Sequence, residues 1–139
     1  MTDSSAKPNW ECYPISVHAV ILNEKKEVLQ LKQTYTDLRW GLPWGSVEKW
    51  ETVHAALKRE CIEELDCAID IKYTSGIYYH SKYNSHVVIC LCSIVKGEIT
   101  LSSEHSEYRY FPLDTLSEVQ QVRVRDCLEF SWEVKCRAF

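Results

Sequence analysis

The chain has 139 residues, of which 45% are apolar and 26% are charged, and its formal net charge is −4. These values are typical of one globular domain that can bury a core without disulfide or metal crosslinks. The sequence contains no run of basic residues, which argues against broad binding to nucleic-acid polymers or to membrane surfaces.

The start of the chain, residues 1–12, is polar and has no hydrophobic stretch. We expect a flexible N-terminal tail without a signal peptide or membrane anchor, followed by a single domain over residues 13–139. The seven cysteines form no C-x-x-C pair, and Cys90 and Cys92 lie in the apolar run VVICLCSIV. We interpret them as small, buried, reduced thiols, which favours a cytoplasmic location.

The first half of the domain is predicted to contain two strands and a helix. β-Branched and apolar residues predict strands over residues 13–23 and 28–33, joined by a charged turn. Residues 51–65 contain neither glycine nor proline. Within them an apolar residue recurs every four positions, at Val53, Leu57, Cys61 and Leu65. This spacing predicts an amphipathic helix.

The second half is predicted to add further strands and a second helix. Long strands are expected over residues 68–83 and 85–102, and a shorter strand over residues 107–113. Mostly helical spacing of apolar residues predicts a helix within residues 115–133. The expected fold class is α/β (α+β), a mixed sheet between helices.

Three glutamates gather on one side of the first predicted helix. Glu60, Glu63 and Glu64 fall within an arc of roughly 100° on a helical wheel. Glu60 and Glu64 repel each other at a spacing that costs a few tenths of a kcal/mol in an isolated helix. A hard divalent cation would offset this repulsion, because Mg²⁺ prefers carboxylate oxygens. Taken alone, ExxEE is also compatible with a solvated acidic face.

The surrounding residues favour the metal-binding interpretation. The segment GSVEKWETVHAALKRECIEELDC reads G-x5-E-x7-R-E-C-x-E-E-x-D-C. It resembles the signature of the Nudix hydrolase family, G-x5-E-x7-R-E-U-x-E-E-x-G-U, in which U is a bulky apolar residue. WGLP before this segment and EHSEYRYFPLDTL late in the chain also resemble Nudix domains. The likeness covers most of residues 13–130.

The resemblance implies a Nudix fold and Mg²⁺-dependent hydrolysis of a pyrophosphate bond. The implied substrate is a small nucleoside diphosphate linked to a group X, with a nucleoside triphosphate, oxidised or otherwise non-standard forms included, as the favoured case. The implied ligands of Mg²⁺ or Mn²⁺ are Gly45, through its carbonyl, and Glu60, Glu63 and Glu64. Glu51 and Arg59 would orient these ligands. The protein is expected to be a monomer or a homodimer, with no nucleic-acid polymer and no membrane as partner.

The sequence departs from the family at three positions where Nudix proteins usually carry glycine. Asp66 is a mild change, since Asp tolerates the left-handed conformation that closes a helix. Trp44 and Trp50 would each cost about 1–2 kcal/mol if their positions require a positive φ. We expect Trp40 to pack at the edge of the core and Trp44 to face the cleft and stack on the substrate base.

Two loop acids, Glu104 and Glu107, lie where some relatives place a general base or an additional metal ligand. A charged surface loop is the commoner explanation for such residues. His105 lies between them and could serve instead, although an exposed loop histidine is the commoner case.

Two tyrosines are further candidates for substrate binding. Tyr79, on a predicted strand, and Tyr83, in the turn after it, could each stack on a nucleobase. Alternation along the strand places Tyr78 on the face opposite to Tyr79, so at most one of that pair can face the cleft.

Two other functions remain open at this point. One is a Nudix-fold module that binds nucleotides but turns over poorly, because Trp44 and Trp50 distort the loop. The other is isopentenyl-diphosphate isomerase, which can share this fold. That enzyme requires a cysteine and an acid facing each other across the pocket, whereas the nearest cysteines are predicted to lie on the buried face of the helix or inside a strand.

Overall fold

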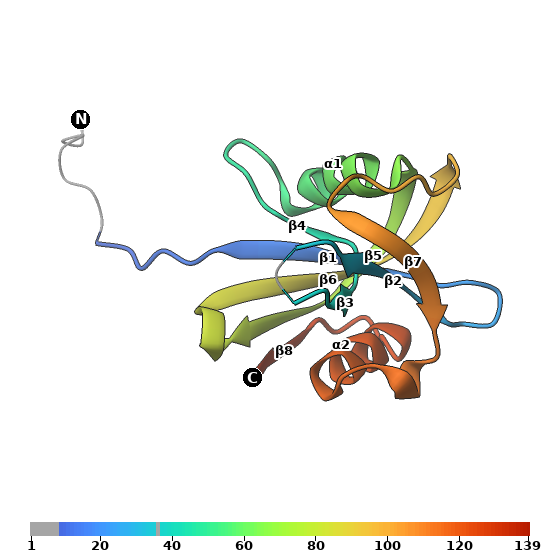
Figure 1. The fold of residues 1–139 in the computed structure, drawn as a ribbon. Coiled ribbons are helices and arrows are strands. Elements are labelled where there is room, and N and C mark those ends of the chain that lie inside the picture. Colours follow the sequence, from blue (N-terminus) through green and yellow to red (C-terminus); the bar gives the residue numbers. More distant parts are fainter. Residues whose placement is uncertain (1–8, 36) are drawn as a thin grey trace.

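The computed structural model describes residues 9–35 and 37–139. Two sheets lie between two helices, with α1 on one side and α2 on the other (Figure 1). The larger sheet has the strand order β4-β1-β6-β5-β8, formed by Trp44–Ser46, Ile15–Ile21, Ser85–Lys96, Ala68–His80 and Lys135–Ala138. The smaller sheet has the order β3-β2-β7, formed by Trp40–Gly41, Val28–Gln33 and His105–Phe111.

The larger sheet is mixed, as predicted. β1 pairs with β6 in parallel and β5 pairs with β8 in parallel, whereas the β1–β4 and β5–β6 pairs are antiparallel. The three-stranded antiparallel sheet is separate from it, where the sequence indicated a single sheet. Both sheets contribute to the core that the helices cover.

Both helices begin at a side chain that caps the first turn. Helix α1 spans Val53–Leu65, and the hydroxyl of Thr52 accepts a hydrogen bond from the Ala55 backbone N–H at 3.0 Å. It ends at Asp66, which adopts the left-handed conformation with φ 56°. Helix α2 spans Glu118–Leu128 and is capped in the same way by Ser117. The aspartate therefore closes α1 where the family usually uses glycine.

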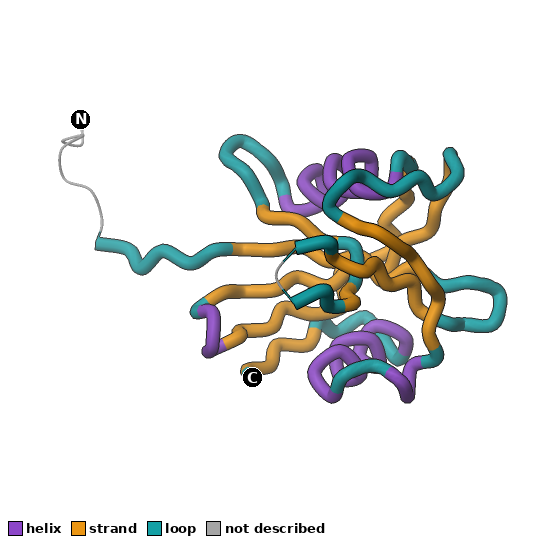
Figure 2. Tube along the Cα trace, viewed as in Figure 1, coloured by secondary structure: helices purple, strands orange, loops and turns teal. Residues whose placement is uncertain are grey.

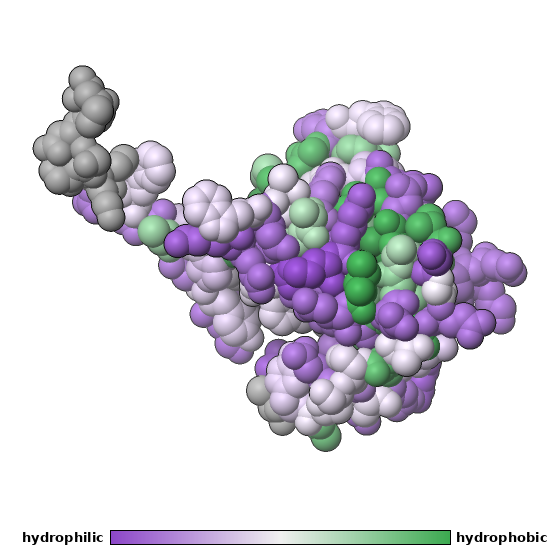
Figure 3. Space-filling view, turned by 90° about the horizontal axis from the view of Figure 1, so that it is seen from above, coloured by the Kyte–Doolittle hydropathy of each residue, from purple (hydrophilic) through white to green (hydrophobic). Residues whose placement is uncertain are grey.

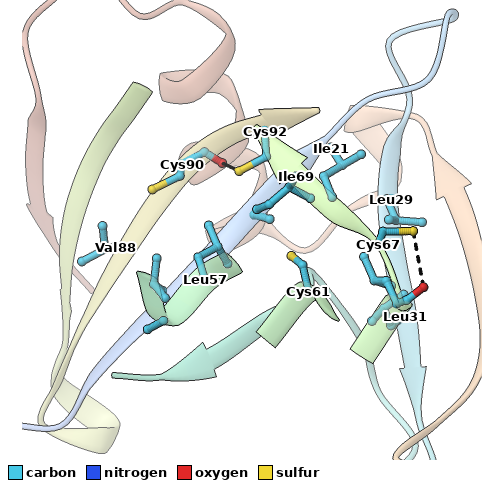
Figure 4. Close-up of a cluster of buried hydrophobic side chains, with 14 residues drawn as sticks. Ile21, Leu29, Leu31, Leu57, Cys61, Cys67, Ile69, Val88, Cys90 and Cys92 are labelled. Carbon is cyan, nitrogen blue, oxygen red and sulfur yellow. Dashed lines mark hydrogen bonds between the residues drawn. The ribbon is translucent and has the colours of Figure 1, made fainter. Parts of the chain in front are cut away.

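The predicted four-residue spacing places one side of α1 in the core. Leu57 and Cys61 of α1 point toward Ile69, Cys90 and the other side chains of the larger sheet (Figure 4). Leu29 and Leu31 of β2 close the same cluster. A second cluster, centred on the fully buried Tyr78, packs between the sheet and α2. Alternate residues of β1 and β6 enter the two clusters, as period-two patterning requires.

The predicted elements are confirmed with small shifts of their ends, and three short strands, β3, β4 and β8, were missed. The loop after β6 runs beside α1 before β7 begins (Figure 2), where the sequence predicted a longer strand. Residues 81–83 form a short 3-10 helix instead of continuing β5, and a second one spans residues 113–115. Strand β8 was not predicted. Of the predicted flexible tail, residues 1–8 lie outside the described residues, and residues 9–12 carry neither helix nor strand.

The cysteines are free thiols, as predicted from the sequence. All seven lie in the described residues and are free, and Cys90 and Cys92 are both buried. Seen from the α1 side, hydrophilic side chains cover much of the surface (Figure 3). In the part of the chain that the structure describes, neither helix has the length and apolar character needed to cross a bilayer.

Candidate active site

Arg59 binds the acids of the signature segment together. Its guanidinium donates two hydrogen bonds to the Glu51 carboxylate, at 2.7 and 3.0 Å. It also donates to Glu60 at 2.7 Å, to Glu63 at 3.3 Å and to the Ser46 carbonyl at 3.1 Å. This pairing lowers the pKa of the Glu51 carboxyl. The arginine thus ties the loop before α1 to the helix itself, as the resemblance implied.

Gly45 leaves room for Glu60 beside strand β4. Gly45 pairs with Val17 of β1 and faces α1, and a Cβ added to it would lie 2.0 Å from Glu60 Cγ. The Glu60 carboxylate therefore lies directly against the backbone of β4. Its pKa is raised, mainly by burial.

Glu64 is the most buried acid of the helix, with 5% of its surface exposed. One carboxylate oxygen accepts a hydrogen bond from the Trp44 backbone N–H at 3.2 Å. Burial, with the nearby Glu60 charge, raises the pKa of Glu64 to about 8. An acid with so little solvation needs a proton or a cation beside it.

The end of the loop before β7 and the first residue of β7 bring two more side chains to Glu64. Glu64, Glu104 and His105 each offer a ligand atom, and these atoms lie within 4.8 Å of one another. No other such group occurs in residues 9–35 and 37–139. His105 is 6% exposed, where the sequence favoured an exposed loop histidine. Burial lowers the pKa of its imidazole, which keeps the ring neutral near pH 7.

These acids surround one cavity of about 330 Å³. Its walls come from the loop after β2, from β4, from α1 and from the loop before β7, and are formed by Tyr35, Trp44, Gly45, Ser46, Glu48, Glu60, Glu63, Glu64, Ser102, Ser103 and Glu104. The predicted metal-binding positions, the loop acid Glu104 and Trp44 thus meet in one place.

Five predicted site residues do not line this cavity: Glu51 and Arg59, which are described above, and Glu107, Tyr79 and Tyr83. Glu107 lies on β7 with its carboxylate 2.5 Å from the Arg109 guanidinium. Tyr79 donates a hydrogen bond to Asn84 at the turn between β5 and β6, and Tyr83 is 53% exposed near that turn. Glu107, Tyr79 and Tyr83 are therefore not brought together with the predicted metal-binding residues at this cavity, and their roles in the site stay predictions.

Trp44 and Trp50 occupy different conformations. Trp44 belongs to β4, pairs with His18 of β1 and does not have a positive φ. Its indole stacks on the His18 imidazole, with ring centroids 5.4 Å apart and an interplanar angle of 13°. Trp50 has φ 70° and is 97% exposed. The predicted strain therefore applies to Trp50 and not to Trp44. Trp40 packs half-buried against Phe111, as expected for the edge of the core.

Comparison with known proteins shows which family this chain belongs to. The NUDIX domain family model matches residues 13–127. The chain belongs to the Nudix family. Membership makes it a hydrolase of pyrophosphate bonds.

Individual relatives match different shares of the chain. A MutT-like protein of Streptomyces ambofaciens is 25% identical over 84% of this chain and 78% of its own length. A zebrafish (Danio rerio) protein named 8-oxo-dGDP phosphatase NUDT18 is 42% identical over 60 residues, 40% of this chain and 18% of that protein. The crystal structure of an ADP-ribose pyrophosphatase from Streptococcus suis superimposes with a TM-score of 0.75 at 23% identity, covering 92% of this chain and all of that one. This last likeness concerns the fold.

Proposed function

We propose that this Nudix protein hydrolyses a nucleoside triphosphate, standard or oxidised, with Mg²⁺ or Mn²⁺ as cofactor. The observation that carries the proposal is the convergence of Glu60, Glu63, Glu64 and Glu104 on one cavity. A polyphosphate cannot approach four carboxylates without cations between them, because like charges at such distances repel strongly. Metal binding and substrate binding in this cavity are therefore coupled.

The residues present fit a divalent cation. Because Gly45 has no side chain, the Glu60 carboxylate can lie against the backbone of β4. Glu64 is a buried acid with a raised pKa. In the proposed assignment Glu60, Glu63 and Glu64 hold the ion with the Gly45 carbonyl. When bound, such an ion neutralises phosphate charge and lowers the pKa of a bound water.

The other residues of the site position these ligands and the substrate. Arg59 and Glu51 orient the helix acids, through the hydrogen bonds described above. Glu104 acts as general base or as an additional ligand, and its place in the cavity wall favours it over Glu107. Trp44 contributes an aromatic wall for the base.

The substrate class rests on the relatives and on the size of the cavity. The name of the zebrafish relative refers to an oxidised guanine nucleotide, which supports a purine nucleotide substrate. A cavity of about 330 Å³ suits a small molecule. We propose a cytoplasmic location, because the five buried thiols fit a reducing compartment. We also propose that the protein is a monomer or a homodimer.

The two rival functions lose support from particular residues. A binding module with a distorted loop required strain at Trp44 and Trp50. Only Trp50 has a positive φ, whereas Trp44 lies in a regularly paired strand beside the acids. An isomerase required a cysteine in the pocket, and none of the residues that line the cavity is a cysteine.

The deciding experiment is a screen of nucleoside triphosphates, 8-oxo-dGTP, nucleotide sugars and dinucleoside polyphosphates with Mg²⁺ and with Mn²⁺. Released phosphate or pyrophosphate is measured for the native protein and for Glu60→Gln and Glu64→Gln, which keep the volume of each side chain. We expect turnover of a triphosphate by the native protein alone. Nucleotide binding without product above the level of these variants would identify a binding module instead.

A further inference from the structure

The backbone holds the loop before β7 firmly against the end of α1. The Ser102 N–H donates a hydrogen bond to the Glu64 carbonyl at 3.3 Å. On the other side, the Thr34 N–H donates to the Glu104 carbonyl at 2.9 Å. The His105 N–H donates to the Ser102 carbonyl at 3.2 Å. Main-chain hydrogen bonds to two different elements therefore fix the position of Glu104 and His105 beside Glu64.

The distances within this group suit one ion. The ligand atoms of Glu64, Glu104 and His105 lie within 4.8 Å of one another. Two atoms that each bind an ion at about 2.1 Å lie at most about 4.2 Å apart. We expect an ion bound between the three side chains to draw their ligand atoms to within this limit.

The His105 imidazole has no role in holding the protein together that the structure shows. The side chain is 6% exposed, and its Nδ1 atom is buried without a hydrogen-bond partner. A buried polar atom left unpaired is costly, and a bound ion is one of the explanations for such an atom in a native protein. A ring in this state beside two carboxylates has the character of a metal ligand.

Nitrogen in the ligand set changes which ion is preferred. Mg²⁺ takes oxygen ligands almost exclusively, whereas imidazole binds the divalent transition metals. Glu60 and Glu63, which contact Arg59, lie outside the three-residue group and offer oxygen alone.

We propose that Glu64, Glu104 and His105 form a mixed oxygen and nitrogen site that binds Mn²⁺ or another divalent transition metal in preference to Mg²⁺. This inference rests on the proposed function only in placing a cation beside Glu64 and Glu104, which line the cavity, whereas His105 is not among its lining residues. His105 thereby sets the identity of the ion, and the all-oxygen positions nearer Arg59 suit Mg²⁺.

The test uses metal alone, with no nucleotide, so that it is independent of the reaction. Mn²⁺ is added to the native protein, and pulsed EPR measures nitrogen hyperfine coupling to the bound ion. We expect coupling in the native protein and in His54→Gln, which removes an exposed histidine of α1, and no coupling in His105→Gln. Bound Mn²⁺ without nitrogen coupling in the native protein would overturn the proposal, and so would coupling that persists in His105→Gln.

Affinities supply a second measurement that a loss of folding would not mimic. By calorimetry, His105→Gln should weaken Mn²⁺ binding about 10–100-fold. It should affect Mg²⁺ much less, so that the Mn²⁺ preference is lost. Glu104→Gln replaces a charged carboxylate with a neutral amide and should weaken both ions together. Equal weakening of both ions by His105→Gln would mean that the histidine only supports the loop, and the proposal would fail.

Discussion

Glu60 fills the space that a side chain at Gly45 would need, since an ideal Cβ on Gly45 would lie 2.0 Å from Glu60 Cγ and 2.4 Å from its Oε1. Gly45→Ala should therefore push the Glu60 carboxylate out of the cavity. We expect turnover to fall about 10²-fold, the usual effect of misplacing a reacting group by about 1 Å. Steady-state kinetics at saturating metal ion measure it.

Gly41→Ala is the matched control. Gly41 lies in β3, does not have a positive φ and has no atom within 4 Å of its ideal Cβ position. This variant should retain native kinetics. Similar activity of the two alanine variants would show that the contact between Gly45 and Glu60 has no part in the reaction.

The exposed Trp50 should be a site of removable strain. A left-handed conformation costs a residue with a Cβ about 1–2 kcal/mol, whereas glycine adopts it freely but loses more backbone entropy on folding. Trp50→Gly should thus raise the free energy of unfolding by about 1 kcal/mol, as measured by urea denaturation. Trp10→Gly changes another exposed tryptophan that lacks a positive φ, and it should not stabilise the protein.

His18 should make stability depend on pH. Burial, with the nearby Arg123 charge, lowers the pKa of His18 to about 3, and its Nδ1 atom is buried without a partner. Because the unfolded chain binds a proton near pH 6.5 and the folded chain does not, stability is full above that pH and falls as pH decreases toward 3. The loss by pH 5 should be about 2 kcal/mol.

Denaturation of native protein, His18→Gln and His54→Gln at pH 7 and pH 5 measures this effect. The pH dependence should shrink only in His18→Gln, because His54 is exposed. An unchanged dependence in His18→Gln would assign the acid sensitivity to other groups.

Trp44 lines the cavity and is expected to contact the substrate base. Trp44→Ala should raise KM by about tenfold through loss of one stacking contact. Trp44→Phe retains an aromatic face and should recover most of this loss. If Trp44→Ala lowers only the thermal stability and leaves KM unchanged, stacking on His18 is the sole role of the indole.

Substitutions of Glu104 and Glu107 should affect turnover differently. Glu104→Ala should lower turnover by about 10²–10⁴-fold, the range typical of losing a general base. Glu107→Ala should leave turnover unchanged, since its carboxylate contacts Arg109 outside the cavity. The reverse ranking in kinetic measurements would remove Glu104 from the site.

Sequence patterns predicted the parts of the fold that depend on buried side chains. Helix α1 was predicted from the spacing of residues such as Leu57 and Cys61, and these residues are fully buried. Strand β8 was missed because Lys135–Ala138 is only four residues long, contains no β-branched or aromatic residue and is mostly exposed. It pairs with β5 through backbone groups, which every residue carries.

The candidate site was predictable where a motif fixes positions along one helix. The spacing of the signature placed Glu60 and Glu64 together, and the structure brings both to one cavity. The burial of His105 could not be deduced, since it depends on where a loop distant in sequence folds against α1. The direction of Tyr79 likewise depends on register irregularities in β5 that no local pattern reveals.

Arg59 gives the metal-free protein a built-in countercharge. Its guanidinium holds the Glu51, Glu60 and Glu63 carboxylates within hydrogen-bonding distance before any ion arrives. An entering cation thus replaces the Arg59 guanidinium beside carboxylates that already lie close together, and does not have to overcome their mutual repulsion to bring them together. Preorganisation of this kind lowers the entropic cost of binding. Binding of the metal ion should accordingly replace hydrogen bonds from Arg59 to these carboxylates, with little rearrangement of α1.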